Sequence, residues 1–327
     1  MLAGFLLPAA AEPGIPFPLS RSRPVNISMV MNSPTPEATE ELRGAVETLR
    51  DAGHTVFPRL TFEKGDGRRF ARESAERGCD LVIAAGGDGT VHEVGNGIHD
   101  FLAVRARRGG YAAPEDGPRL GIVPLGTGND LAGALNLPTD VQTAVAAAVA
   151  GRSVPFDVAM LNGEGFLNVS TGGIGAEATE ETPDEVKRIL GPVAYFITGV
   201  RKFVSLEVSS ARFSDSGILY DGPFLIFAVG NSRRTGGGNW LTPLADPCDG
   251  LLDVCIVREM PRRDLLGLLP ELRAGRHLDH PAVIYTRVPS LTVESDEALS
   301  VNVDGEPMGG RMLHYAVSPY RIQLSLP

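Results

Sequence analysis

The sequence contains little cysteine, a single tryptophan and no long apolar run. The cysteines are Cys79, Cys248 and Cys255, an odd number without a Cys-x-x-Cys pair. Such sparse use of cysteine is typical of buried, reduced thiols in a cytoplasmic protein. Because a transmembrane helix needs about 20 consecutive apolar residues, we expect no membrane-spanning segment.

Basic side chains are scarce relative to acidic ones. The chain has 30 Lys and Arg against 40 Asp and Glu, which gives a formal net charge of −10. A nucleic-acid-binding face must neutralise phosphates, so this charge argues against a nucleic-acid partner. The histidines suggest no zinc site, since His277 and His280 lie near a probable loop without a third His or Cys beside them in the sequence.

The start of the chain is rich in proline. Residues 1–24 contain five prolines and a short apolar stretch that no Lys or Arg precedes. The stretch therefore lacks the basic region with which a signal peptide begins. We predict a disordered leader over 1–24.

From residue 25 the sequence alternates between strand and helix patterns. In the helices apolar residues recur with helical spacing, whereas the segment 80–85 is continuously apolar, as a sheet covered on both faces requires. We expect strands at 25–32, 54–60, 80–85 and 120–123, and helices at 36–52, 66–77, 90–98 and 141–150. This alternation predicts a doubly wound α/β domain over 25–155.

After residue 155 the pattern changes to strands separated by Gly, Asn, Asp and Pro. We expect strands at 156–161, 166–170, 206–213, 224–229, 251–257, 291–293 and 299–303, and helices at 183–204 and 264–273. The pattern predicts a second, mostly antiparallel β domain over 156–327. We leave open that its last segment packs back on the first domain.

The strongest chemical signal is the loop Gly-Gly-Asp-Gly-Thr-Val-His at 86–92, between a buried strand and a helix. Glycines let a backbone approach a ligand closely, and the N-terminus of a helix favours a phosphate. Asp88 could hold a metal ion or a reacting hydroxyl. A tight turn with a capping Asp or Thr would explain a glycine pair alone, but the acid and the hydroxyl inside the run favour phosphate binding.

A second loop, Pro-Leu-Gly-Thr-Gly-Asn-Asp at 124–130, also follows a strand. Loops at the carboxyl ends of parallel strands converge on the ligand crevice, so Thr127 could reach a phosphate there. Asp130 could instead cap the helix that follows. The motifs of P-loop NTPases and protein kinases are absent, as is a dinucleotide-binding G-x-G-x-x-G in the first strand-to-helix turn.

Together with four other segments, these loops resemble the diacylglycerol kinase catalytic family. The YegS-like lipid kinases are the most similar group, over residues 25–327. The matching segments, in chain order, are LTFEKGDGRRFARE (60–73), GGDGTVHEVGNGI (86–98), PLGTGND (124–130), STGGIGAEATEETP (170–183), GNSRRTGGGNWLTPLADPCDGLLDV (230–254) and VNVDGEPMGG (301–310).

The resemblance implies roles for particular residues. It implies an ATP site made of Thr61, Gly86, Gly87, Asp88, Gly89, Thr90, Val91, His92 and Thr127, although the family usually has Asn at position 92. It implies a Mg²⁺ site, or a structural Ca²⁺ site, at Asp246, Asp249 and Leu251, whose oxygen ligands suit a hard cation.

The resemblance also assigns Glu306 as the proton acceptor. Asp88 is the competing candidate, because sphingosine kinases use the acid of the glycine loop as the base. A purely structural interpretation remains open too, since the preceding Asp-Gly pair is a strong hairpin signal.

The function implied is that of a Mg²⁺-dependent kinase that transfers the γ-phosphoryl group of ATP to a hydroxyl of a diacylglycerol- or phosphatidylglycerol-like lipid. An NAD kinase-like enzyme shares a similar GGDG loop, but PLGTGND and the late Asp-Gly-Glu argue against it. A non-catalytic lipid- or nucleotide-binding protein would not need both Asp88 and Glu306. We expect a cytoplasmic protein that is peripheral at the inner membrane face, where its lipid substrate lies, and we leave a homodimer open.

Overall fold

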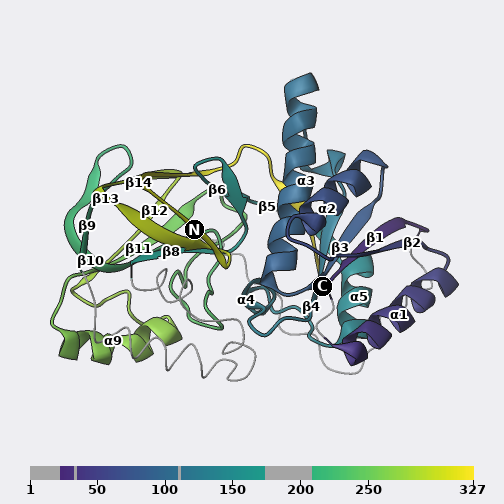
Figure 1. Cartoon of the computed structure of the whole chain (residues 1–327), viewed down its shortest axis with the longest axis horizontal. Helices are drawn as coiled ribbons and strands as arrows, with labels where there is room; N and C mark the ends of the chain where they lie inside the picture. Colours follow the sequence, from purple (N-terminus) through teal and green to yellow (C-terminus); the bar gives the residue numbers. More distant parts are fainter. Residues whose placement is uncertain (1–22, 33–34, 110–111, 174–207) are drawn as a thin grey trace, which may run out of the picture. The chain divides into compact units, whose positions relative to one another are not determined.

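The computed structural model describes residues 23–32, 35–109, 112–173 and 208–327 (Figure 1). The described residues form two compact units. The first unit runs to Val158 and also includes Pro319–Pro327, and the second unit is Ala159–Ser318. Most of the expected leader and the helix expected at 183–204 lie outside the described residues.

The first unit is built on a six-stranded sheet in the order β2-β1-β3-β4-β15-β5. Strands β1 to β4 and β15 are parallel to one another, and β5 runs antiparallel to β15. The strands are β1 (Asn26–Met31), β2 (Thr55–Leu60), β3 (Leu81–Gly86), β4 (Arg119–Pro124), β5 (Arg152–Phe156) and β15 (Ile322–Leu326). The α-helices are α1 (Pro36–Asp51), α2 (Asp66–Glu76), α3 (Asp88–Gly109), α4 (Asp130–Ala134) and α5 (Val141–Ala150), and a 3₁₀ turn covers Pro114–Asp116.

Helices cover both faces of this sheet (Figure 1). The apolar sides of α1 and α5 pack on one face, against side chains such as Ile27 and Ile83. On the other face α2 packs against β1, where the Ser74 hydroxyl donates a hydrogen bond to Ser28 Oγ at 2.7 Å. Since every residue of β3 is buried, the continuous apolar run in the sequence follows directly from this two-sided cover.

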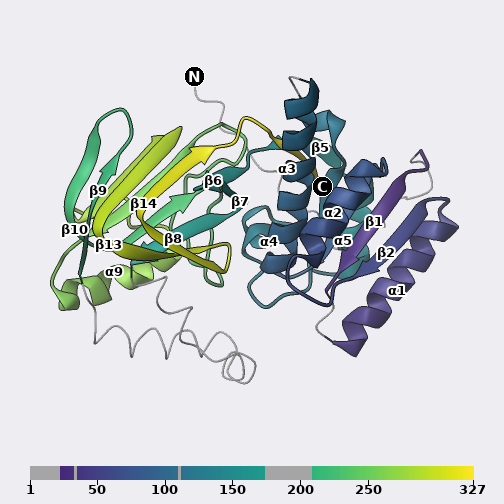
Figure 2. The ribbon, with the colours of Figure 1, turned by 45° about the horizontal axis from the view of Figure 1, so that its top comes forward.

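The second unit is a nine-stranded antiparallel sheet in the order β12-β11-β10-β8-β13-β14-β6-β7, with β9 paired to both β10 and β13. Figure 2 shows β14 beside β13 and β6. The strands are β6 (Ala159–Leu161), β7 (Glu164–Phe166), β8 (Val169–Gly173), β9 (Ser209–Ser214), β10 (Ile218–Gly230), β11 (Leu252–Arg258), β12 (Val283–Val288), β13 (Ser290–Val303) and β14 (Glu306–Val317). Helix α9 (Arg262–Ala274) packs on β8, β10 and β11 through Leu265, Leu268 and Leu272.

The fold class predicted from the sequence is confirmed, but several element boundaries were wrong. Helix α3 continues to Gly109 rather than ending at 98, although glycines lie in its first half. The expected strand 156–161 is interrupted after Phe156, where the first unit gives way to the second. The two strands expected at 291–293 and 299–303 form one strand, β13, because its register shift at Glu294–Leu299 absorbs the polar stretch between them.

Candidate active site

The two glycine loops and Thr61 lie at one edge of the parallel sheet. Strands β2, β3 and β4 end at Leu60, Gly86 and Pro124, and the last two residues are paired in register. The N–H and the hydroxyl of Thr61 both donate to the carbonyl of Met31, at 3.0 and 3.2 Å. The structure therefore gathers three predicted nucleotide-binding segments at the carboxyl edge, where open α/β sheets bind ligands.

The two glycine loops touch each other through their backbones. A Cβ added to Gly126 would lie only 2.5 Å from Gly87 Cα, and the Leu125 N–H donates to the Gly86 carbonyl at 2.9 Å. Asn129 holds the second loop closed: its Oδ1 accepts from the Gly126 N–H at 2.9 Å and its Nδ2 donates to the Gly126 carbonyl at 2.7 Å. Glycine is thus required at Gly126 by loop packing, before any ligand is considered.

Asp88 begins helix α3 and lies beside the second loop. Its Oδ2 is 3.0 Å, and that of Asp130 is 3.7 Å, from the point that a Cβ on Gly128 would occupy. Two carboxylates therefore flank Gly128. This pairing of an acid with a glycine loop suits a phosphate accompanied by a divalent cation.

Several residues of the predicted ATP site point into the fold. Thr90, Val91 and His92 are buried, at 7%, 6% and 7% exposure. The Nε2 of His92 lies 3.2 Å from Asn96 Nδ2 on the next turn of α3. Gly89 and Thr127 are exposed. We therefore expect Thr90, Val91 and His92 to contribute to phosphate binding by forming the N-terminus of α3 rather than through their side chains.

Glu306 is half-buried at the start of β14, after a two-residue turn. Asp304 and Gly305 both have positive φ, +51° and +98°, which suits a tight hairpin turn. The carboxylate of Asp304 accepts three hydrogen bonds, from the N–H groups of Leu167, Asn168 and Val169 at 2.7, 3.0 and 3.1 Å. These bonds attach the turn before Glu306 to the segment that joins β7 and β8.

The predicted metal ligands Asp246 and Asp249 lie in one loop before β11. Asp246 Oδ1 accepts from the Cys248 N–H at 3.1 Å, and Asp249 Oδ1 accepts from the Leu251 N–H at 2.9 Å. The other oxygen of Asp249 forms an ion pair with Arg287. In the described part of the chain, no three His, Cys, Asp or Glu side chains are arranged to hold a metal ion.

The donor set of this loop nevertheless suits a hard cation, because Asp246, Asp249 and the Leu251 carbonyl offer only oxygens. Arg287 would compete with a cation for this loop, because it forms an ion pair with Asp249. Its Nε also lies 3.4 Å from Oδ2 of the buried Asp253. Burial raises the pKa of Asp253, while the Tyr285 hydroxyl and Arg287 lower it in part.

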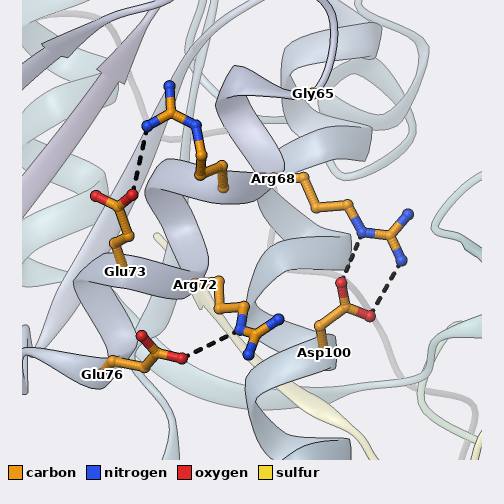
Figure 3. A pocket seen from close by; sticks show the side chains of 7 residues that line it. Gly65, Arg68, Arg72, Glu73, Glu76 and Asp100 are labelled. Atoms are coloured by element: carbon orange, nitrogen blue, oxygen red, sulfur yellow. Dashed lines mark hydrogen bonds and ion pairs between the residues drawn. The ribbon is translucent and has the colours of Figure 1, made fainter.

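A surface pocket lies along α2 and the facing side of α3 (Figure 3). Its arginines are each paired with an acid: Arg68 with Asp100 at 2.6 Å, Arg72 with Glu76 at 3.1 Å, and Arg69 with Glu73 at 3.4 Å. No predicted site residue lines the pocket. Because its charges neutralise one another, we do not regard it as an anion site.

Sequence reasoning missed the residues that hold the loops in place. The role of Asn129 could have been predicted locally, because Asn is one of the residues that adopt a positive φ in turns, and its partner Gly126 is only three positions away. The bonds of Asp304 gave none, since they join residues 135 to 137 positions apart. Arg287 is likewise 38 positions from Asp249.

Two family models together match most of the chain. The model of the diacylglycerol kinase catalytic domain matches residues 27–161, and that of the YegS C-terminal NAD kinase beta sandwich-like domain matches residues 168–326.

Curated relatives match over most of their length. A protein of Pseudomonas aeruginosa strain UCBPP-PA14 named "probable lipid kinase YegS-like" is 39% identical over 289 residues, which cover 88% of this chain and 90% of that protein. A protein of the same name from Yersinia pseudotuberculosis serotype I strain IP32953 is 38% identical and covers 88% of this chain and 92% of its own.

A solved structure shares the fold. The crystal structure of a "putative diacylglycerol kinase" from Bacillus anthracis strain Sterne superimposes with a TM-score of 0.75 at 23% identity. The match covers 93% of this chain and 97% of that chain. Among the described residues, no helix is both long and apolar enough to cross a membrane.

Proposed function

The chain belongs to the YegS-like lipid kinase family, and we propose that it transfers the γ-phosphoryl group of ATP to a hydroxyl group of a lipid. One observation carries the proposal for the donor: the loops around Gly87 and Gly126 meet at the carboxyl edge of the parallel sheet, with Asp88 beside them. A phosphate binding there would meet backbone N–H groups at the N-terminus of α3.

Phosphoryl transfer needs positioning and charge neutralisation more than covalent help from the protein. The glycine loops would hold the phosphates, and Thr61 and Thr127 would contact the nucleotide. The Asp88 carboxylate would be available to the cation that accompanies the phosphates. When bound, Mg²⁺ would neutralise phosphate charge. Asp88 is the acid nearest to the loops, and the loop of Asp246, Asp249 and Leu251 supplies the oxygen donors of a second, structural site.

For the acceptor, we propose that Glu306 takes the proton of the lipid hydroxyl as it attacks the γ-phosphorus. A carboxylate suits this role when its position is fixed. The N–H groups of Leu167, Asn168 and Val169, which donate to the Asp304 carboxylate, fix the turn before Glu306. The lipid class rests on the relatives, which are named as lipid kinases. The sequence has only three cysteines and no Cys-x-x-Cys pair, which is typical of a reducing compartment, so we propose that the enzyme works on the cytoplasmic face of a membrane.

The test is consumption of ATP by the purified chain with Mg²⁺ and vesicles that contain diacylglycerol or phosphatidylglycerol. Phosphate incorporated into a lipid supports the proposal. The second family model is described as NAD kinase-like, so NAD is the required comparison acceptor. Phosphorylation of NAD without that of any lipid would contradict the proposal. Binding of ATP without turnover would favour a non-catalytic role.

A further inference from the structure

Glu93 lies on α3, in the turn that follows the glycine loop, and its side chain reaches another helix. Its Oε1 accepts from the Gly65 N–H at 2.6 Å, and its Oε2 accepts from the Gly67 N–H at 2.8 Å. Gly65 is the N-cap of α2, and no side chain of that helix caps it. The carboxylate therefore takes the place of an N-cap and lies at the positive end of the α2 dipole.

The surrounding backbone is shaped for this contact. Gly65 has a φ of +90°, which few other residues adopt. A Cβ on Gly67 would lie 2.7 Å from Glu93 Oε2, and a Cβ on Gly97 would overlap the carbonyl oxygen of Arg68. Glycines on both helices thus let α2 and α3 approach closely enough for one carboxylate to bridge them.

The turn that leads into α2 follows Thr61, one of the residues proposed to bind ATP. Asp66 Oδ2 accepts from the N–H groups of Phe62 and Glu63, at 2.9 and 3.3 Å. Hydrogen bonds therefore hold the turn after Thr61 from within, and Glu93 holds it from α3. The side chain of Glu93 thus joins this turn to the helix that begins at Asp88.

We propose that Glu93 is a positioning residue that fixes Thr61 relative to the glycine loop. Because its carboxylate already occupies the N-terminus of α2, it also leaves the N-terminus of α3 as the helix end that receives the nucleotide phosphates. This inference rests on the proposed function, since it specifies how the ATP site is held together.

The experiment compares Glu93→Gln and Glu93→Ala with a matched control, Glu76→Gln. Glu76 is an exposed acid on α2 whose only bond among the described contacts is to Arg72. Two quantities are measured on the full chain: the dissociation constant of a non-hydrolysable ATP analogue, and amide hydrogen exchange of the segment 61–67. Circular dichroism checks that each variant is folded.

We expect Glu93→Ala to raise the dissociation constant about tenfold, because it removes hydrogen bonds to a charged group. Glu93→Gln keeps one acceptor oxygen and should raise it less. Exchange in 61–67 should accelerate in both variants and stay unchanged in Glu76→Gln. Turnover at saturating ATP should fall less than ATP affinity, a split that a general loss of folded protein would not give.

A double-mutant cycle with Gly67→Ala tests the contact itself. Gly67→Ala should weaken ATP binding in the wild-type background, because its Cβ displaces the Glu93 carboxylate. It should have a smaller effect in the Glu93→Ala background, where that carboxylate is gone and only the Cβ of residue 93, 3.0 Å from the added Cβ, remains. Fully additive effects would overturn the inference.

The failures of the inference and of the proposed function are distinguishable. If Glu93→Ala is folded and its exchange in 61–67 matches wild type, the inference is overturned whatever the nucleotide does. Faster exchange with unchanged ATP affinity overturns it as well. A wild-type chain that binds no ATP overturns the proposed function, while the exchange data still report whether Glu93 holds the turn.

Discussion

The glycine loops of the first unit and the candidate residues of the second unit are held in place by different means. In the first unit, backbones touch: Gly87 and Gly126 meet without side chains, and the sheet edge presents the loops. In the second unit, carboxylates fix the candidate residues: Asp304 accepts hydrogen bonds from three backbone N–H groups, and Asp249 forms an ion pair with Arg287. An added Cβ should therefore damage the contact of the glycine loops most, whereas an amide in place of a carboxylate should damage the turn before Glu306.

The largest expected effect concerns Glu306. Glu306→Gln should lower kcat by about 10²–10⁴-fold if the residue is the general base, because the amide cannot accept the proton. ATP affinity should change little, because Gln keeps the size of the side chain and the glycine loops that hold the nucleotide are unaltered. Initial rates and ATP binding are measured beside Glu297→Gln, an exposed glutamate of β13. Unchanged turnover would remove Glu306 as the base and favour Asp88.

A smaller effect is expected at the contact of the glycine loops. In Gly126→Ala the new Cβ would lie 2.5 Å from a backbone atom, Gly87 Cα, so the loops must separate. Overpacking of this kind costs about 1–3 kcal/mol, and we expect ATP affinity to fall by about tenfold or more. Gly109→Ala is the control, because nothing lies within 4 Å of its added Cβ. Normal ATP binding by Gly126→Ala would show that the loops adapt.

The corresponding change in the second unit is Asp304→Asn. The amide can accept fewer of the three N–H bonds, so the free energy of unfolding should fall by about 1–3 kcal/mol. Urea denaturation measures it, with the exposed Asp296→Asn as the control. Turnover should fall with little change in ATP affinity. If ATP affinity fell as much as turnover, the division of roles between the two units would be wrong.

The smallest effect is expected at Arg287. Arg287→Met removes the guanidinium that pairs with Asp249 and Asp253, so a divalent cation no longer competes with it. We expect the affinity of the loop for Mg²⁺ or Ca²⁺ to rise several-fold, on the order of the 0–1 kcal/mol of an exposed ion pair. Calorimetric titration compares the variant with Arg276→Met, whose partner is Glu271. Equal affinities would mean that Arg287 does not limit cation binding.

Local patterns in the sequence predicted much of the fold. Helix α1 was visible because Leu42, Val46 and Leu49 recur with helical spacing and Pro36 begins it. The buried strand β3 and the loop after it were visible because both are contiguous in the chain. The antiparallel strands were harder, since β14 begins with glycines and polar residues, so that its alternating burial is not matched there by an alternation of apolar residues in the sequence.

Sequence by itself determined the fold class, the glycine loop that carries Asp88 and the turn before Glu306, since each depends on residues close together in the chain. Only the tertiary structure decided what holds them. Glu93 bonds to Gly65, 28 positions away, and Asp304 to Leu167, 137 positions away. Such contacts form when separate helices and strands pack, and no local pattern encodes which carboxylate will meet which N–H group.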